Sequence, residues 1–233
     1  MKKQLINFYD LKTVKDMNEK SYNPGFPNTD IEIPARVCLQ GCSGSGKTTI
    51  LLNYIYLTND TWAHIYIITK SSEPLYDYLQ KQLKYKNIDV YYDISKLPSP
   101  KDLPKSEEQK LVIFDDCVSM KNQSTIIDYF IYGRKKNITS FYLSQNYYSI
   151  PKAIRAQFSY LIIVKVGQKR DLNLILSDSG GLIEKDELRR LYDEATKEKF
   201  NFLKINLNTA DMNKKFSKNF NEFYLLDDKK NVE

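Results

Sequence analysis

Short apolar runs alternate with amphipathic segments along most of the chain. Runs rich in β-branched and aromatic residues predict buried strands, whereas apolar residues at helical spacing predict helices. Strands are predicted over residues 35–40, 64–69, 87–93, 111–117, 137–145, 159–166 and 200–207. Helices are predicted over residues 48–57, 74–85, 124–133, 150–158, 169–179 and 184–199. This alternation predicts an α/β fold with a mostly parallel central sheet flanked by helices on both faces.

The turn-forming and polar segments around these elements predict one domain with two short arms. Residues 1–33 form an expected N-terminal arm, because SYNPGFPNTD contains prolines, a glycine and other turn formers just before the first strand. Residues 34–208 carry the alternating pattern and form the expected main domain. Residues 209–233 form an expected lysine- and asparagine-rich tail, in which 221–226 could add a closing strand. The polar, proline-bearing segment 94–110 is predicted to be a surface connection.

Composition narrows the class of protein further. Hydrophobic residues make up 42% of the chain and charged residues 27%, which is typical of a globular protein. No apolar run approaches the roughly 20 residues that span a bilayer, and the N-terminus has no apolar core of a signal peptide. We therefore expect a soluble, non-secreted protein. Three cysteines without metal-ligand spacing and a single histidine argue against zinc chemistry and histidine-based catalysis.

The clearest chemical motif is GCSGSGKTT at residues 41–49, which matches G-x-x-x-x-G-K-[ST] in full. Its glycines allow backbone N–H groups to surround phosphate oxygens, Lys47 reaches the β and γ phosphates, and the Thr48 hydroxyl ligates Mg²⁺. The helix that follows adds its positive N-terminal end to the anion site. The residues predicted to bind ATP are Gly41, Ser43, Gly44, Ser45, Gly46, Lys47, Thr48 and Thr49.

Polar residues at the ends of two later strands extend this site. LVIFDDC ends in Asp115, which is predicted to hold Mg²⁺, and Asp116, which is predicted to activate the attacking water. FYLSQ ends in Gln145, predicted to orient that water or to sense the γ-phosphate. Alternatively, Asp116 caps the following turn and Gln145 simply bounds a strand. The order of the segments predicts the class of phosphate-loop fold in which another strand lies between the loop strand and the acidic strand.

Several kinds of phosphate-loop protein remain open at this point. No guanine-selecting N-K-x-D motif occurs, so a GTPase is disfavoured. A small-molecule or nucleotide kinase remains an alternative, although a kinase usually brings several arginines on a lid and this chain has only six in total. A nucleotide-driven switch that assembles capsid or membrane components is a third alternative.

The chain resembles a known family, the genome-packaging ATPases of nucleocytoplasmic large DNA viruses and virophages, of the poxvirus type, within the FtsK/HerA superfamily. The resemblance rests on GCSGSGKTT, LVIFDDC and YGRKKNITSFYLSQNYYSIPKAIRAQFSYLIIVK in this order, and it covers roughly residues 34–180. Two residues depart from the pattern. Lys135 stands where many viral relatives have histidine, and Asp116 stands where cellular relatives tend to have glutamate.

The resemblance implies a ring of five or six identical subunits that moves double-stranded DNA without reading its sequence and hydrolyses ATP at subunit interfaces. An arginine from a neighbouring subunit would complete each site, with Arg134 favoured over Arg155. The net charge of +6 is compatible with a polyanionic partner. Lys121 and Asn122, in the loop after the acidic pair, are predicted to contact DNA phosphates. The resemblance also implies a capsid vertex as a docking partner, and a location in the virion or in the viral factory of the host-cell cytoplasm.

Overall fold

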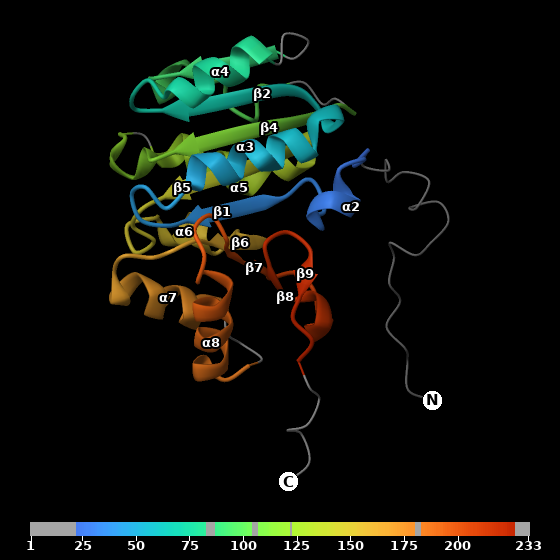
Figure 1. Cartoon of the computed structure of the whole chain (residues 1–233). Helices are drawn as coiled ribbons and strands as arrows, with labels where there is room; N and C mark the ends of the chain where they lie inside the picture. The colour runs from blue at the N-terminus through green and yellow to red at the C-terminus, as the bar shows by residue number, and fades with distance from the viewer. Residues whose placement is uncertain (1–21, 83–86, 104–106, 122, 180–182, 227–233) are drawn as a thin grey trace, which may run out of the picture.

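A computed structural model describes residues 22–82, 87–103, 107–121, 123–179 and 183–226, and within them nine strands form a single sheet (Figure 1). The strands are β1 (Arg36–Gln40), β2 (Trp62–Thr69), β3 (Asn87–Tyr91), β4 (Gln109–Asp115), β5 (Ile138–Ser144), β6 (Tyr160–Ile163), β7 (Leu203–Asn206), β8 (Phe216–Lys218) and β9 (Glu222–Phe223). Their order across the sheet is β3-β2-β4-β5-β1-β6-β7-β8-β9. The first six strands in this order run parallel, and the last three add antiparallel neighbours.

The strand order places the predicted site residues at one edge. Strand β5 lies between β1, which leads into the phosphate loop, and β4, which carries the acidic pair, so the predicted insertion is confirmed. Gln40 pairs with Ser144, and Asp115 pairs with Leu143, at the carboxyl ends of these strands. Because parallel strands end at the same edge of a sheet, the loops that follow β1, β4 and β5 converge there.

Helices cover both faces of the sheet, as the alternating pattern predicted. They are α2 (Phe26–Thr29), α3 (Lys47–Leu57), α4 (Pro74–Gln82), α5 (Gln123–Tyr132), α6 (Lys152–Arg155), α7 (Lys169–Ser179) and α8 (Lys185–Ala195). Helices α3 and α4 pack on one face, where Val37 and Leu39 point, and α5 to α8 pack on the other, where Cys38 points (Figure 1). Successive residues of β1 are therefore buried on opposite faces, which explains why this strand is apolar throughout.

Some elements differ from their predicted extents. Strand β4 begins at Gln109, before the predicted start, and the predicted surface connection before it buries Ile94 and Leu97 in the core. The hydroxyl of Tyr129 on α5 donates to the Pro98 carbonyl at 2.7 Å, which fastens this connection to the helix layer. The helix predicted over 74–85 is described only to residue 82.

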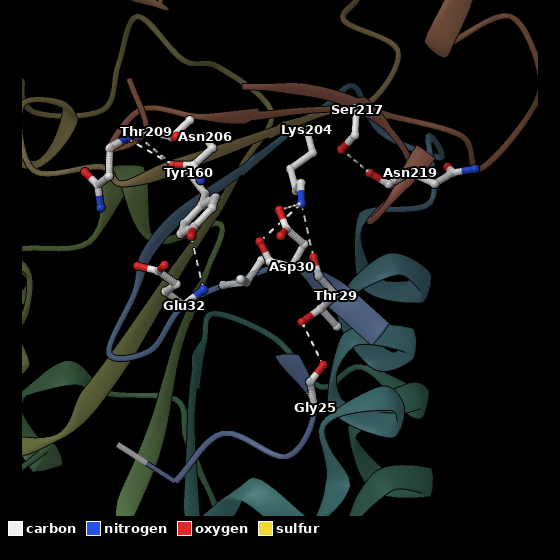
Figure 2. Close-up of polar contacts among 12 residues, drawn as sticks. Gly25, Thr29, Asp30, Glu32, Tyr160, Lys204, Asn206, Thr209, Ser217 and Asn219 are labelled. Carbon is white, nitrogen blue, oxygen red and sulfur yellow. Dashed lines mark hydrogen bonds and ion pairs between the residues drawn. The ribbon is translucent and has the colours of Figure 1, made fainter. Parts of the chain in front are cut away.

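Packing extends past both of the expected domain boundaries. Before residue 34, Ile31 is fully buried, and after residue 208, strands β8 and β9 continue the sheet. Lys204 on β7 donates from Nζ to the carbonyls of Thr29 and Asp30, both at 3.2 Å, and to the Asp30 carboxylate at 2.9 Å (Figure 2). This fully buried ammonium ties the segment before β1 to the last strands of the sheet. The division at 34 and 208 remains a prediction.

Candidate active site

The loops after β1, β2, β4 and β5 surround a cavity of about 430 Å³. Nine of the predicted site residues border it: Ser43, Gly44, Gly46, Lys47, Thr48, Thr49, Asp115, Asp116 and Gln145. Gly41 and Ser45 are buried in the loop beneath it. Other polar and apolar residues complete the wall, namely Thr69, Lys70, Ser71, Glu73, Leu75 and Phe200. The sequence motifs did not point to this second group.

The loop between β1 and α3 depends on glycine at particular places. Gly44 and Gly46 have φ angles of 72° and 98°, in the left-handed region that glycine adopts without a steric cost. At Gly41, an added Cβ would lie 2.5 Å from the Ser45 hydroxyl oxygen, so the loop closes on itself too tightly for a side chain. Helix α3 begins at Lys47, immediately after the loop, so its unpaired N–H groups lie at the cavity.

Lys47 projects its ammonium into this loop. Its Nζ donates to the carbonyls of Gly41 at 2.9 Å and Cys42 at 3.1 Å. Burial lowers the pKa of Lys47, and the nearby charges of Asp115 and Asp116 act in the opposite direction. The acidic pair therefore offsets only part of the effect of burial on the Lys47 ammonium.

Asp115 is anchored by a residue that the sequence motifs did not indicate. The Tyr76 hydroxyl, on α4, donates to Asp115 Oδ2 at 2.7 Å. Burial raises the pKa of Asp115, whereas this hydrogen bond and the charge of Lys47 lower it. Tyr76 thus stabilises the ionised carboxylate that a metal requires. The predicted helix contained Tyr76, but nothing in the spacing related it to the acidic strand.

Asp116 and Gln145, predicted from separate strands, lie next to each other. Asp116 follows β4 in a left-handed conformation, with a φ of 52°, that is uncommon for residues other than glycine. Its backbone N–H donates to the Leu143 carbonyl at 3.1 Å, and Gln145 Nε2 donates to Asp116 Oδ2 at 3.4 Å. Both side chains are exposed and border the cavity. A water molecule in the cavity could therefore contact a carboxylate and an amide together.

A buried carboxylate supports the segment after Gln145. Asp171, on α7, is 1% exposed and accepts from the backbone N–H groups of Tyr147 and Tyr148, both at 3.1 Å. Charged acceptors form stronger hydrogen bonds than neutral ones, so Asp171 fixes the path of the chain just beyond Gln145. The sequence placed Asp171 on a helix but gave no sign of its partners.

The two candidate arginines lie away from the cavity in their own subunit. Arg155 Nη1 pairs with Asp178 Oδ2 at 2.8 Å, and its guanidinium lies over the ring of Tyr147. Arg134 follows α5 in a short 3₁₀ helix (Gly133–Lys136), before β5, and is exposed. Within the described part of the chain, no ion pair involves Arg134. Neither arginine borders the cavity.

Comparisons with known proteins agree with this geometry. Residues 28–199 match the family described as Poxvirus A32 protein. The DNA packaging protein OPG160 of Variola virus is 27% identical over 165 residues, which cover 66% of this chain and 58% of the relative. Its counterpart in Vaccinia virus (strain Copenhagen) is 28% identical over the same shares. The chain thus spans about three fifths of the length of these curated relatives.

Solved structures support the same fold. The genome packaging NTPase B204 from Sulfolobus turreted icosahedral virus 2, in complex with ATP-gammaS, aligns with a TM-score of 0.57 at 15% identity. The alignment covers 81% of this chain and 98% of B204. The B204 complex with AMPPCP aligns with a TM-score of 0.57 at 18% identity. The predicted α/β phosphate-loop fold and the resemblance to viral packaging ATPases are both confirmed, and this chain belongs to the Poxvirus A32 protein family.

Proposed function

We propose that this protein is an ATPase that drives double-stranded DNA into a viral capsid. The observation that carries the proposal is the single cavity in which Lys47, the acidic pair and Gln145 meet. The matched relatives are described as DNA packaging proteins, and the structurally similar NTPase binds ATP-gammaS and AMPPCP. A kinase remains the alternative, and the experiment below separates the two.

The residues around the cavity suit both ATP and Mg²⁺. The Thr48 hydroxyl and the Asp115 carboxylate border the same space, and oxygen ligands of these types are those that Mg²⁺ prefers. When bound, the metal would neutralise charge on the β and γ phosphates. Lys47 would leave the carbonyls of Gly41 and Cys42 to donate to the phosphates, which the glycine-rich loop surrounds with N–H groups.

Asp116 and Gln145 are proposed to handle the attacking water. The Asp116 carboxylate would accept a proton from that water, and the neighbouring Gln145 amide would orient it towards the γ-phosphate. The 3.4 Å contact between them makes the position of Asp116 depend on where Gln145 lies. If Gln145 moved to contact the γ-phosphate, its hydrogen bond to Asp116 would change and the Asp116 carboxylate would shift. In this way Gln145 would signal the presence of the γ-phosphate to Asp116.

The site also supports an assembly of several subunits. Among described residues, lysines but no arginine border the cavity. An arginine from a neighbouring subunit adds about 10³ to 10⁵ in rate in related phosphoryl-transfer enzymes. We propose a homo-oligomeric ring of five or six subunits, with Arg134 as the arginine given to the neighbour and Arg155 as the less favoured candidate.

The other partners follow from packaging itself. The ring would contact DNA phosphates without reading the sequence, in part through the exposed Lys121, which lies in the loop that follows Asp116. Asn122, predicted to act with it, lies outside the described residues. Docking on a capsid vertex, in the virion or in a viral factory of the host cytoplasm, completes the proposal. Within the described residues, no helix is long and apolar enough to cross a membrane.

The test is steady-state ATP hydrolysis with and without long double-stranded DNA, across a range of protein concentrations. The Lys47→Ala variant should abolish turnover, whereas Lys81→Ala, an exposed lysine on α4, serves as the matched control. Stimulation by DNA that rises with protein concentration is expected for shared sites. Turnover indifferent to DNA at every concentration, but dependent on a small acceptor, would instead establish a kinase.

A further inference from the structure

Phe200 lies against the phosphate loop in an unusual conformation. It precedes β7 and has a φ of 70°, in the left-handed region where a bulky side chain carries a steric cost. A Cβ added at Gly46 would clash with Phe200 Cδ1 and would lie 2.9 Å from Cε1, so one edge of the ring packs directly on this glycine. The side chain is nevertheless 44% exposed. The backbone thus holds an aromatic surface open beside the phosphate loop.

A second cavity meets the first one at this ring. It has a volume of about 310 Å³ and is bounded by loop residues 42–45, by residues 164–165 after β6 and by the segment 196–201. Phe200, Ser43 and Gly44 border both cavities. A volume of this size lies at the lower end of the range for small-ligand pockets. The space extends from the phosphate site on the side of the loop that lies away from the acidic pair.

The chemistry of this second cavity differs from that of the phosphate site. Besides the aromatic ring it offers the aliphatic side chain of Val164 and a polar pair, in which Asn201 Nδ2 donates to Glu198 Oε2 at 3.0 Å. Lys199 Nζ lies 4.8 Å from the centre of the Phe200 ring. A cation–π contact at such an exposed position is weak, so another flat or charged group can replace it.

We propose that the base of the bound nucleotide stacks on Phe200, and that the segment 196–201 forms the nucleoside end of the site. This inference rests on the proposed function, since it assigns the part of ATP that the phosphate loop does not hold. The acidic pair and Gln145 mark the γ-phosphate end of the first cavity, so the nucleoside leaves the loop on another side. Phe200 offers an exposed aromatic face that directly adjoins the loop.

An apolar groove between α3 and α4 is the competing place for the base. Thr49, Leu75 and the exposed rings of Tyr56 and Tyr78 line it. These tyrosines lie on regular helices and carry no backbone strain, whereas the left-handed Phe200 contacts the loop itself. We therefore assign the base to Phe200, and Tyr78 provides the matched control.

The experiment measures binding of AMPPCP, GMPPCP and inorganic tripolyphosphate by calorimetry, each in the presence of Mg²⁺. Phe200→Ala should weaken AMPPCP binding on the order of tenfold, the effect typical of losing one stacked base. The affinity for GMPPCP should fall by a similar factor, because stacking depends little on the identity of the base. Tripolyphosphate, which has no base, should bind as in the wild type. Phe200→Tyr should bind both nucleotides with wild-type affinity, and Tyr78→Ala should leave the affinities for all three ligands unchanged.

The outcomes separate this inference from the function on which it rests. Equal loss of tripolyphosphate and AMPPCP in Phe200→Ala would mean that the ring only shapes the phosphate loop, which overturns the assignment. Unchanged AMPPCP binding in Phe200→Ala overturns it too. A loss confined to Tyr78→Ala would move the base to the α3–α4 groove. Wild-type protein that binds neither AMPPCP nor tripolyphosphate would refute the nucleotide site as a whole.

Discussion

Replacement of Asp171 tests how the segment behind the proposed γ-phosphate sensor is held. Asp171 accepts two backbone N–H groups, from Tyr147 and Tyr148, and is 1% exposed. Asp171→Ala removes both acceptors at once. The N–H of Tyr147 is buried and that of Tyr148 is partly buried, so water replaces the lost carboxylate poorly.

The size of the effect follows from these two bonds. A hydrogen bond to a charged group contributes about 1.5–3 kcal/mol, so two such bonds amount to roughly 3–6 kcal/mol. Part of this is recovered, because the variant no longer keeps a carboxylate out of water. We expect a net loss of about 2–4 kcal/mol in the free energy of unfolding for Asp171→Ala. Asp171→Asn keeps one acceptor oxygen and should lose less.

Urea unfolding, followed by circular dichroism, measures this loss. Asp186→Ala is the matched control, because Asp186 lies in the first turn of α8, as Asp171 lies in that of α7, but is exposed. The control should change the unfolding free energy by less than about 0.5 kcal/mol. If Asp171→Ala were no less stable than Asp186→Ala, Asp171 would not hold the segment after Gln145, and the reasoning would be refuted.

Two further substitutions test other contacts. Tyr76→Phe removes the hydroxyl that lowers the pKa of Asp115, so that pKa should rise further and the acid limb of the ATPase pH profile should move to higher pH. If Tyr76→Phe still hydrolyses ATP and the acid limb of its pH profile lies where it does in the wild type, Tyr76 does not lower the pKa of Asp115. Lys204→Met leaves the Asp30 carboxylate and two carbonyls without their buried ammonium, and should cost about 2–4 kcal/mol in urea unfolding. A wild-type free energy of unfolding in Lys204→Met would show that the contacts of Lys204 with Thr29 and Asp30 do not stabilise the fold.

The sequence predicted those features that local pattern determines. Apolar runs located the strands of the parallel core, and the invariant spacing of the phosphate-loop motif located Lys47 and Thr48. Asp115, Asp116 and Gln145 were predictable because parallel strands end at a common edge, so polar residues at strand ends gather there. The same reasoning, applied to the strand that ends at residue 69, would have pointed to the polar segment after it, which also borders the cavity.

The features that the sequence did not predict depend on contacts between distant segments. Tyr76 reaches Asp115 from a helix 39 positions earlier in the chain, and Asp171 reaches Tyr147 from 24 positions later. Phe200 packs on Gly46, although most of the domain's sequence lies between the two residues. Neither the identity of these residues nor their local spacing distinguishes them from ordinary helix or loop residues. Only the packing of the helices, and of the segment before β7, against the sheet and the phosphate loop brings them together.

The contacts of the arginines also bear on the choice between them. Arg155 is only 16% exposed at its side chain, and its guanidinium is already shared between Asp178 and the ring of Tyr147. To enter a neighbour's site it would have to break that ion pair, and Asp178 Oδ2 would keep only the Tyr147 hydroxyl, at 3.3 Å, as a donor among the described residues. Moving Arg155 would also remove its contact with the ring of Tyr147, which lies in the segment after Gln145. Use of Arg155 by a neighbouring subunit would therefore weaken the packing behind Gln145 in its own subunit. Exposed Arg134 has no such ties within the described residues, and it can therefore serve a neighbour without cost to its own site.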